Sequence, residues 1–180
     1  MKLYFVALIL PEGLNEMVQS YKLRMKEKYG CRVALNSPAH ITFVPPFRML
    51  ESNEPSVIQI INEVSREINS FWVHTNDFGS FPPRTIFIGV RENKELSTAK
   101  ELVNAYLAKP NCDVIKMDSR PFHPHITIAN RDLQKDDYAQ AWQMFAQSIF
   151  QQQWMAQGLS LLRHNKKNWD VVYTSQFNMQ

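Results

Sequence analysis

Hydrophobic and polar positions along the chain follow two periods, one typical of strands and one typical of helices. Apolar runs and alternating stretches predict strands over residues 3–10, 39–44, 71–76, 85–90, 125–129, 159–164 and 170–176. Apolar residues three or four positions apart predict helices over residues 14–29, 56–68, 97–108 and 136–153, and the last of these is expected to be the longest. The pattern therefore mixes helices and strands along the whole chain.

Local signals indicate where several of these elements should begin or end. Pro45-Pro46 is expected to stop the second strand, because proline has no N–H to donate to a neighbouring strand. Residues 78–83 are expected to form a turn-rich linker, and Ser97 is expected to cap the third helix. Each half then contains a strand, a helix, a histidine-containing strand and a helix, with strands added afterwards. This order predicts an α+β fold of two similar lobes that face each other across a groove.

Composition is that of an ordinary globular protein. The chain has 180 residues, 44% of them hydrophobic and 21% charged, and no Pro/Gly/Ser-rich linker divides it, so residues 1–180 are expected to form one domain of two intimately joined lobes. The net charge of +3 argues against a long nucleic-acid track but suits a short anionic ligand. A small substrate that carries phosphate would fit this mild positive charge.

Cysteine usage and hydropathy favour a cytoplasmic protein. Cys31 and Cys112 lie far apart without a CxxC neighbour, which predicts reduced thiols rather than a disulfide framework or a zinc site. The apolar opening run is followed by Pro11-Glu12-Gly13 and lacks a small-x-small cleavage site, so a buried strand is favoured over a signal peptide. No segment approaches the roughly 20 apolar residues of a membrane span.

One four-residue pattern occurs twice, as His40-Ile41-Thr42-Phe43 and as His125-Ile126-Thr127-Ile128. Because strand side chains alternate between faces, the histidine and threonine of each motif would point the same way, roughly 7 Å apart, with the apolar residues behind them. Two such strands facing each other would form a polar site of two imidazoles and two hydroxyls. The competing interpretation is two surface strands that carry these residues by coincidence.

The residues around these motifs resemble the two-histidine (2H) phosphoesterase superfamily, in the branch named for 2′-5′ RNA ligase and RNA 2′,3′-cyclic phosphodiesterase. The resemblance rests on residues 38–47 and 121–129, and on residues 78–81 with Arg84 and the following strand. It covers nearly the whole chain and implies a bilobal fold with antiparallel sheets around a central cleft. It also implies metal-independent phosphodiester chemistry, without a cofactor, on 2′,3′-cyclic phosphates or 2′-5′ linkages. The implied catalytic residues are His40 and His125, and the implied phosphate-binding residues are Thr42 and Thr127.

The chemistry of these side chains agrees with that implication. Opening a cyclic phosphodiester requires one group to take a proton from water and another to protonate the departing ribose oxygen, and histidines with a pKa near 6.5 can do both. Threonine hydroxyls can donate to the non-bridging phosphate oxygens. Near symmetry leaves open which histidine is the base. The expected partner is a small nucleotide or an RNA terminus with a cyclic phosphate, with no membrane or obligate protein partner. The alternatives are a nucleotide-binding module without turnover and a ligase that runs the reaction backward.

Other residues near the motifs are candidates for secondary roles. His123 and His125 have the His-x-His spacing of some metal sites, but no carboxylate or cysteine close in sequence completes one, so no metal is expected. Aromatic rings could stack on a nucleobase and guanidinium groups could contact phosphate, whereas core packing or solvent exposure is the competing interpretation. The candidates for substrate contact are Phe47, Phe81, Arg84, Arg120, Phe122 and His123.

Overall fold

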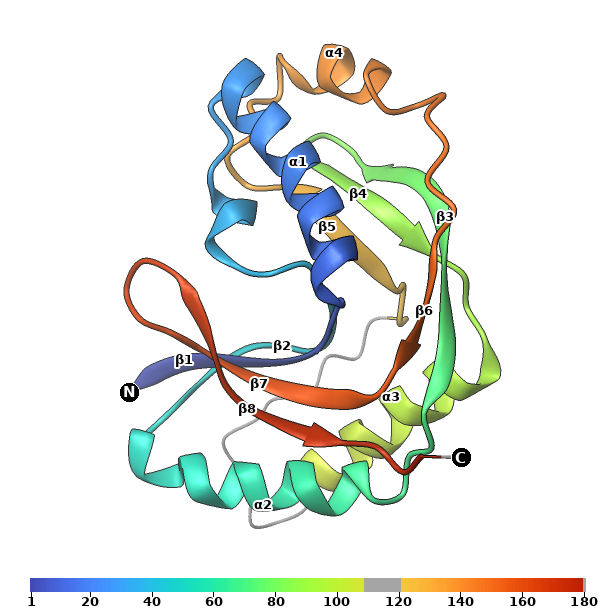
Figure 1. Cartoon of the computed structure of the whole chain (residues 1–180). Helices are drawn as coiled ribbons and strands as arrows, with labels where there is room; N and C mark the ends of the chain where they lie inside the picture. The colour runs from blue at the N-terminus through green and yellow to red at the C-terminus, as the bar shows by residue number, and fades with distance from the viewer. Residues whose placement is uncertain (109–120, 180) are drawn as a thin grey trace.

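The computed structural model describes residues 1–108 and 121–179, and its strands form two antiparallel sheets (Figure 1). The first sheet has the order β2-β1-β7-β8, with bounds β1 Lys2–Ile9, β2 His40–Met49, β7 Gly158–His164 and β8 Trp169–Gln176. The second has the order β5-β4-β3-β6, with bounds β3 Phe71–Phe81, β4 Thr85–Val90, β5 His125–Ala129 and β6 Gln153–Ala156. The helices are α1 Glu12–Tyr29, α2 Glu54–Ser65, α3 Lys94–Leu107 and α4 Tyr138–Gln143, with 3₁₀ turns η1 Val33–Asn36 and η2 Glu51–Asn53.

The two sheets place the two histidine strands in matching positions. Strand β2 lies at the edge of the first sheet beside β1, and β5 lies at the edge of the second beside β4. The two edge strands contact each other, so the motifs meet where the sheets meet. This arrangement confirms the predicted α+β fold with two similar lobes.

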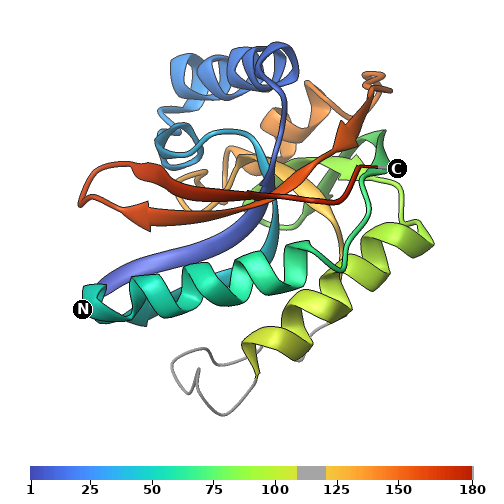
Figure 2. The same cartoon turned by 60° about the horizontal axis from the view of Figure 1, so that its bottom comes forward.

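The helices that connect these strands cross between the lobes. Helix α1 links β1 to β2 of the first sheet, yet it packs against β5 of the second. Helix α3 links β4 to β5 of the second sheet, yet it contacts β2 of the first and lies beside α2 (Figure 2). Each lobe is thus covered by a helix from the other half of the repeat, which explains why the two lobes share one continuous apolar core.

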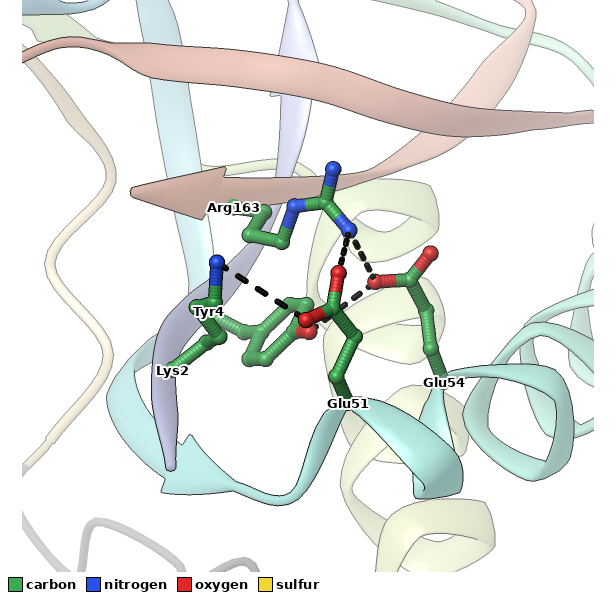
Figure 3. A network of polar contacts seen from close by, with 5 residues as sticks. All are labelled: Lys2, Tyr4, Glu51, Glu54 and Arg163. Atoms are coloured by element: carbon green, nitrogen blue, oxygen red, sulfur yellow. Dashed lines mark hydrogen bonds and ion pairs between the residues drawn. The ribbon is translucent and has the colours of Figure 1, made fainter. Parts of the chain in front are cut away.

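A polar network fastens the turn after β2 to the first sheet (Figure 3). The Tyr4 hydroxyl donates to Glu54 Oε2 at 2.9 Å, and Arg163 Nη1 donates to Glu54 at 3.1 Å and to Glu51 at 2.8 Å. Lys2 lies 3.7 Å from Glu51. Burial, together with the neighbouring Glu54 carboxylate, raises the pKa of Tyr4 to about 12, so its hydroxyl remains a donor across the physiological range.

Two strands extend further than the sequence predicts. Strand β2 continues through Pro45-Pro46 to Met49, because it is an edge strand and the prolines fall at a shift in register between the Tyr4–Phe47 and Val6–Val44 pairs. Prolines are tolerated at such bulges and edges because no neighbour needs their N–H. Likewise, residues 78–81 of the predicted linker belong to β3 and pair with β4, which leaves only a short turn at residues 82–84.

The predicted helix over 136–153 is wrong beyond its first turns. Helix α4 ends at Gln143, and α1, with 18 residues, is the longest described helix. The chain after α4 docks on β3 instead: Phe150 N donates to Asp77 Oδ1 at 2.9 Å, and the Thr75 hydroxyl donates to the Phe150 carbonyl at 2.7 Å. These tertiary hydrogen bonds override the helical period and lead into β6, a strand that the sequence pattern did not predict.

The start of α3 also differs from the prediction. Asn93, rather than Ser97, occupies the cap position, and its side-chain Oδ1 accepts from Leu96 N at 2.7 Å. Ser97 lies within the first turns of the helix, half-buried. Within the part of the chain that the structure describes, no helix is long and apolar enough to cross a membrane.

Candidate active site

The two motifs adopt the predicted alternation of faces. In β2, His40 and Thr42 are half-buried while Ile41 and Phe43 are fully buried, and β5 repeats this pattern. The apolar residues anchor each strand in the core, and the polar residues are left on the other face. Each strand therefore presents one imidazole and one hydroxyl on the same side.

Both motif histidines make the same hydrogen bond to the backbone. His40 Nδ1 lies 2.7 Å from the Pro38 carbonyl oxygen, and His125 Nδ1 lies 2.7 Å from the His123 carbonyl oxygen. A carbonyl oxygen can only accept, so Nδ1 must carry the proton in both rings. In the neutral form the lone pair then lies on Nε2 at the opposite edge of each ring. The carbonyl group two residues before each motif histidine thus fixes the tautomer that a proton acceptor needs.

Aromatic side chains from the neighbouring strands pack against both imidazoles. Phe5 on β1 lies 4.7 Å from His40 between ring centroids, and Phe87 on β4 lies 5.1 Å from His125. Phe81, at the end of β3, lies 4.5 Å from Phe87 and 5.4 Å from His125. These rings exclude water from one side of each imidazole, and they repeat the symmetry of the motifs.

Burial keeps both imidazoles in the neutral form. It lowers the pKa of His40 to about 4, against the opposing effect of the bond to the Pro38 carbonyl, and the charges of Lys22 and His125 lower it further. The pKa of His125 is also lowered, first by burial and then by the charge of His123. Both rings can therefore accept a proton near neutral pH.

One face of α1 holds the loop that precedes the first motif. Asn15 Oδ1 accepts from Ala39 N at 2.7 Å, while Gln19 Nε2 and Lys22 Nζ donate to the Ser37 carbonyl at 3.4 and 3.0 Å. Residues four and three positions apart lie on the same side of a helix, so these three side chains form one clamp. Lys22 is 2% exposed, and burial lowers its pKa to about 8. The clamp fixes the backbone that in turn orients the first motif histidine.

A cavity of about 660 Å³ joins the two motif strands to α3. Thr42 and His125 both line it, so the structure brings one residue of each motif to the same space. His40 and Thr127 lie beside it, each two residues from a lining residue on the same strand face. The other described residues that line it are Phe43 and Pro45 of β2, Phe81, the segment 121–123 and four polar residues of α3, namely Ser97, Lys100, Glu101 and Asn104.

The candidate substrate contacts fall into different environments. Phe81 is 41% exposed and lines the cavity together with Phe122 and His123, so these three stay candidates for substrate contact. Phe47, in contrast, is buried at 6% exposure and stacks on Tyr4, which assigns it to the core. Arg84 lies in the exposed turn before β4, donates to the Arg131 carbonyl at 3.4 Å and is absent from the cavity wall, whereas Arg120 lies outside the described residues.

Several residues of this site were not predicted from the sequence. Lys22 could have been noticed, because it follows Val18 by four positions and precedes Met25 by three on the buried face of α1. A lysine on such a face signals a specific polar partner. Phe5 and Phe87 carried no such signal, because only the pairing of strands in space sets each of them beside a histidine. In residues 1–108 and 121–179, no three His, Cys, Asp or Glu side chains cluster closely enough to hold a metal ion.

Comparison with known proteins agrees with this geometry. A "Putative phosphoesterase" of Halalkalibacterium halodurans is 28% identical over 127 residues, which span 69% of this chain and 68% of that protein. The crystal structure of TT0787 of Thermus thermophilus superposes with a TM-score of 0.71 at 21% identity over 100% of both chains. The structure of E. coli LigT complexed with 3′-AMP gives 0.69 at 17% identity over 98% of both chains. The sequence profile of the 2′-5′ RNA ligase superfamily matches residues 10–168. The chain therefore belongs to the 2′-5′ RNA ligase superfamily of 2H phosphoesterases.

Proposed function

We propose that this protein is a phosphodiesterase that opens 2′,3′-cyclic phosphates of nucleotides or RNA ends by general acid/base catalysis. The observation that carries the proposal is the pair of imidazoles with Nδ1 anchored on a backbone carbonyl and Nε2 left for chemistry. A binding module would have no need of two proton-transfer groups held in matching tautomers. E. coli LigT, which shares the fold, has been solved with 3′-AMP, and a 3′-phosphate is one of the two monoesters that ring opening can produce.

Water is the only co-reactant of the proposed ring opening. Water attacks phosphorus while one imidazole takes its proton, and a new P–O bond forms. The bond from phosphorus to one ribose oxygen breaks, and the other imidazole protonates that oxygen, which gives a phosphomonoester and a free hydroxyl. Thr42 and Thr127 donate hydrogen bonds to the non-bridging oxygens, where preorganised donors stabilise the charge of the transition state.

The surroundings favour His40 as the base and His125 as the acid for hydrolysis. A base must begin neutral, and burial with the adjacent charge of Lys22 keeps the pKa of His40 near 4. His125 lines the cavity, so an anionic phosphodiester bound there raises its pKa by direct attraction. In the reverse direction, which is the ligase reaction, the two roles exchange.

The test is turnover of 2′,3′-cyclic AMP by the purified protein in the presence of EDTA. His40→Ala and His125→Ala should each lower kcat about a hundredfold to ten-thousandfold. Each Thr→Ala variant should cost about 1.5 to 3 kcal/mol in kcat/KM, because its hydroxyl bonds a charged oxygen. His74→Ala, which removes a histidine of β3 outside the site, is the matched control and should retain activity.

Two outcomes would redirect the proposal. Tight binding of the cyclic nucleotide without ring opening would identify a nucleotide-binding module. Joining of RNA ends that carry a 2′,3′-cyclic phosphate and a 5′-hydroxyl would add ligase activity to the same site. Wild-type rates in folded His40→Ala or His125→Ala protein would refute the two-histidine mechanism.

A further inference from the structure

We infer that the polar stripe of α3, made of Ser97 and Glu101, binds the nucleoside part of the substrate next to the phosphate held by the motifs. The inference deepens the proposed function and rests on it in one respect, namely that the phosphate lies at the histidines. It concerns the part of the same cavity that α3 lines.

The size of the cavity calls for more than a phosphate group. Its volume of about 660 Å³ lies in the range of roughly 300–1,000 Å³ typical of small-molecule sites. Thr42 and His125 line this space together with polar residues of α3. A ligand whose phosphate contacts the motifs can therefore reach α3 with its remaining atoms.

The side chains that α3 contributes suit an uncharged, hydrogen-bonding group. Ser97 and Glu101 are four residues apart and therefore share one helix face, with Ser97 half-buried and Glu101 exposed. Within the described part of the chain, neither the Ser97 hydroxyl nor the Glu101 carboxylate has a hydrogen-bonding partner, unlike Asn104, which accepts from Lys100 Nζ at 2.5 Å. A hydroxyl and a carboxylate that face a cavity without a protein partner can bind the hydroxyl groups of a ribose or the amino groups of a base.

The charge of this wall argues for a nucleoside rather than a run of phosphates. Glu101 lines this part of the cavity, and its carboxylate would repel a second phosphate. The neighbouring apolar walls fit the same ligand. Phe81 is 41% exposed, and Phe122 lies with its ring centroid 5.8 Å from the Lys100 ammonium, so flat surfaces for stacking a base lie beside the polar stripe.

The experiment compares binding of 3′-AMP with binding of inorganic phosphate by calorimetric titration. Ser97→Ala and Glu101→Gln should each weaken 3′-AMP binding about three- to tenfold, as expected for one lost hydrogen bond, while affinity for inorganic phosphate stays unchanged. Thr98→Ala and Glu95→Gln are matched controls, because both positions are exposed on the same helix and line a different cavity. These controls should bind both ligands like the wild type.

The outcomes separate this inference from the proposed function. Wild-type affinity for 3′-AMP in both Ser97→Ala and Glu101→Gln would overturn the inference, as would an equal loss of affinity for 3′-AMP and inorganic phosphate. Because the titration needs no turnover, selective weakening of 3′-AMP binding supports the nucleoside site even if the protein fails to open cyclic phosphates. In that case the phosphodiesterase proposal alone would fail.

Discussion

Acidification should destabilise this protein through His40. Burial lowers the pKa of its ring to about 4, against an ordinary value of 6.5, so the unfolded chain binds this proton more readily than the folded protein does. Stability is therefore unaffected by this group above pH 6.5 and falls as the pH drops from 6.5 toward 4. With these two pKa values, proton linkage gives a loss of about 2 kcal/mol between pH 7.5 and pH 5.

The variant His40→Asn isolates this contribution. The asparagine amide can still donate to the Pro38 carbonyl, so the loop geometry is retained while the titrating group is removed. Urea unfolding at pH 7.5 and pH 5 should show the wild type losing about 2 kcal/mol more than the variant on acidification. Groups common to both proteins, including His125 and the carboxylates, cancel in this difference.

An equal loss of stability in the wild type and in His40→Asn would contradict this prediction. It would mean that the His40 ring is hydrated in the folded state and titrates as in an unfolded chain. Burial would then not hold His40 in the neutral form, and the assignment of His40 as the base would fail. Activity measurements alone would not reveal this, because removal of the ring abolishes the chemistry in either case.

Three further substitutions test parts of the site and its support. Lys22→Met removes a charge that lowers the pKa of His40, so the acid limb of the pH profile of kcat/KM should move to higher pH. It also removes the hydrogen bond to the Ser37 carbonyl, and the loosened loop before the first motif should lower kcat about tenfold. Tyr4→Phe deletes a hydroxyl bonded to a carboxylate and should cost about 1.5 kcal/mol in urea unfolding at pH 7.5, whereas no loss would show that the bond is neutral for stability. Gly79→Ala would place a Cβ 2.4 Å from the Phe87 ring, so the free energy of unfolding should fall by about 1–3 kcal/mol. Activity should also fall, because the displaced ring packs against His125. Unchanged stability and activity would show that the ring can move freely.

The alternation of the two motifs could be predicted from the sequence because its signal is local. The two-residue period of residues 40–43 and 125–128 places histidine and threonine on one face, and burial of the intervening residues confirms that alternation. The ends of helices and strands were harder to predict, because they depend on the segments that pack against them. Pro45-Pro46 lies inside β2 only because that strand is at a sheet edge, and the segment after α4 leaves the helix because Asp77 and Thr75 bind its backbone. Such contacts between distant residues have no periodic signal in the sequence.

The surroundings of the two histidines could not be predicted from the sequence, because they too depend on contacts between distant residues. Two nearly identical motifs give no basis for telling the acid from the base, whereas packing supplies one. His40 packs against Phe5, and the charge of the buried Lys22 lowers its pKa, whereas the charge that acts on His125 is that of His123. His125 lies at the cavity, where an incoming anion can reach it.

This difference explains how a symmetric pair can act in one direction. Both imidazoles are held neutral in the free protein, yet the proposed chemistry needs one of them protonated. A bound phosphodiester supplies the missing negative charge and raises the pKa of the nearby rings. The charge of Lys22 opposes that rise at His40, so we propose that a proton taken up from solvent on substrate binding is held by His125. In this proposal the clamp on α1 has two roles: it holds the loop before the first motif, and through the charge of Lys22 it makes the two motifs unequal when the substrate binds.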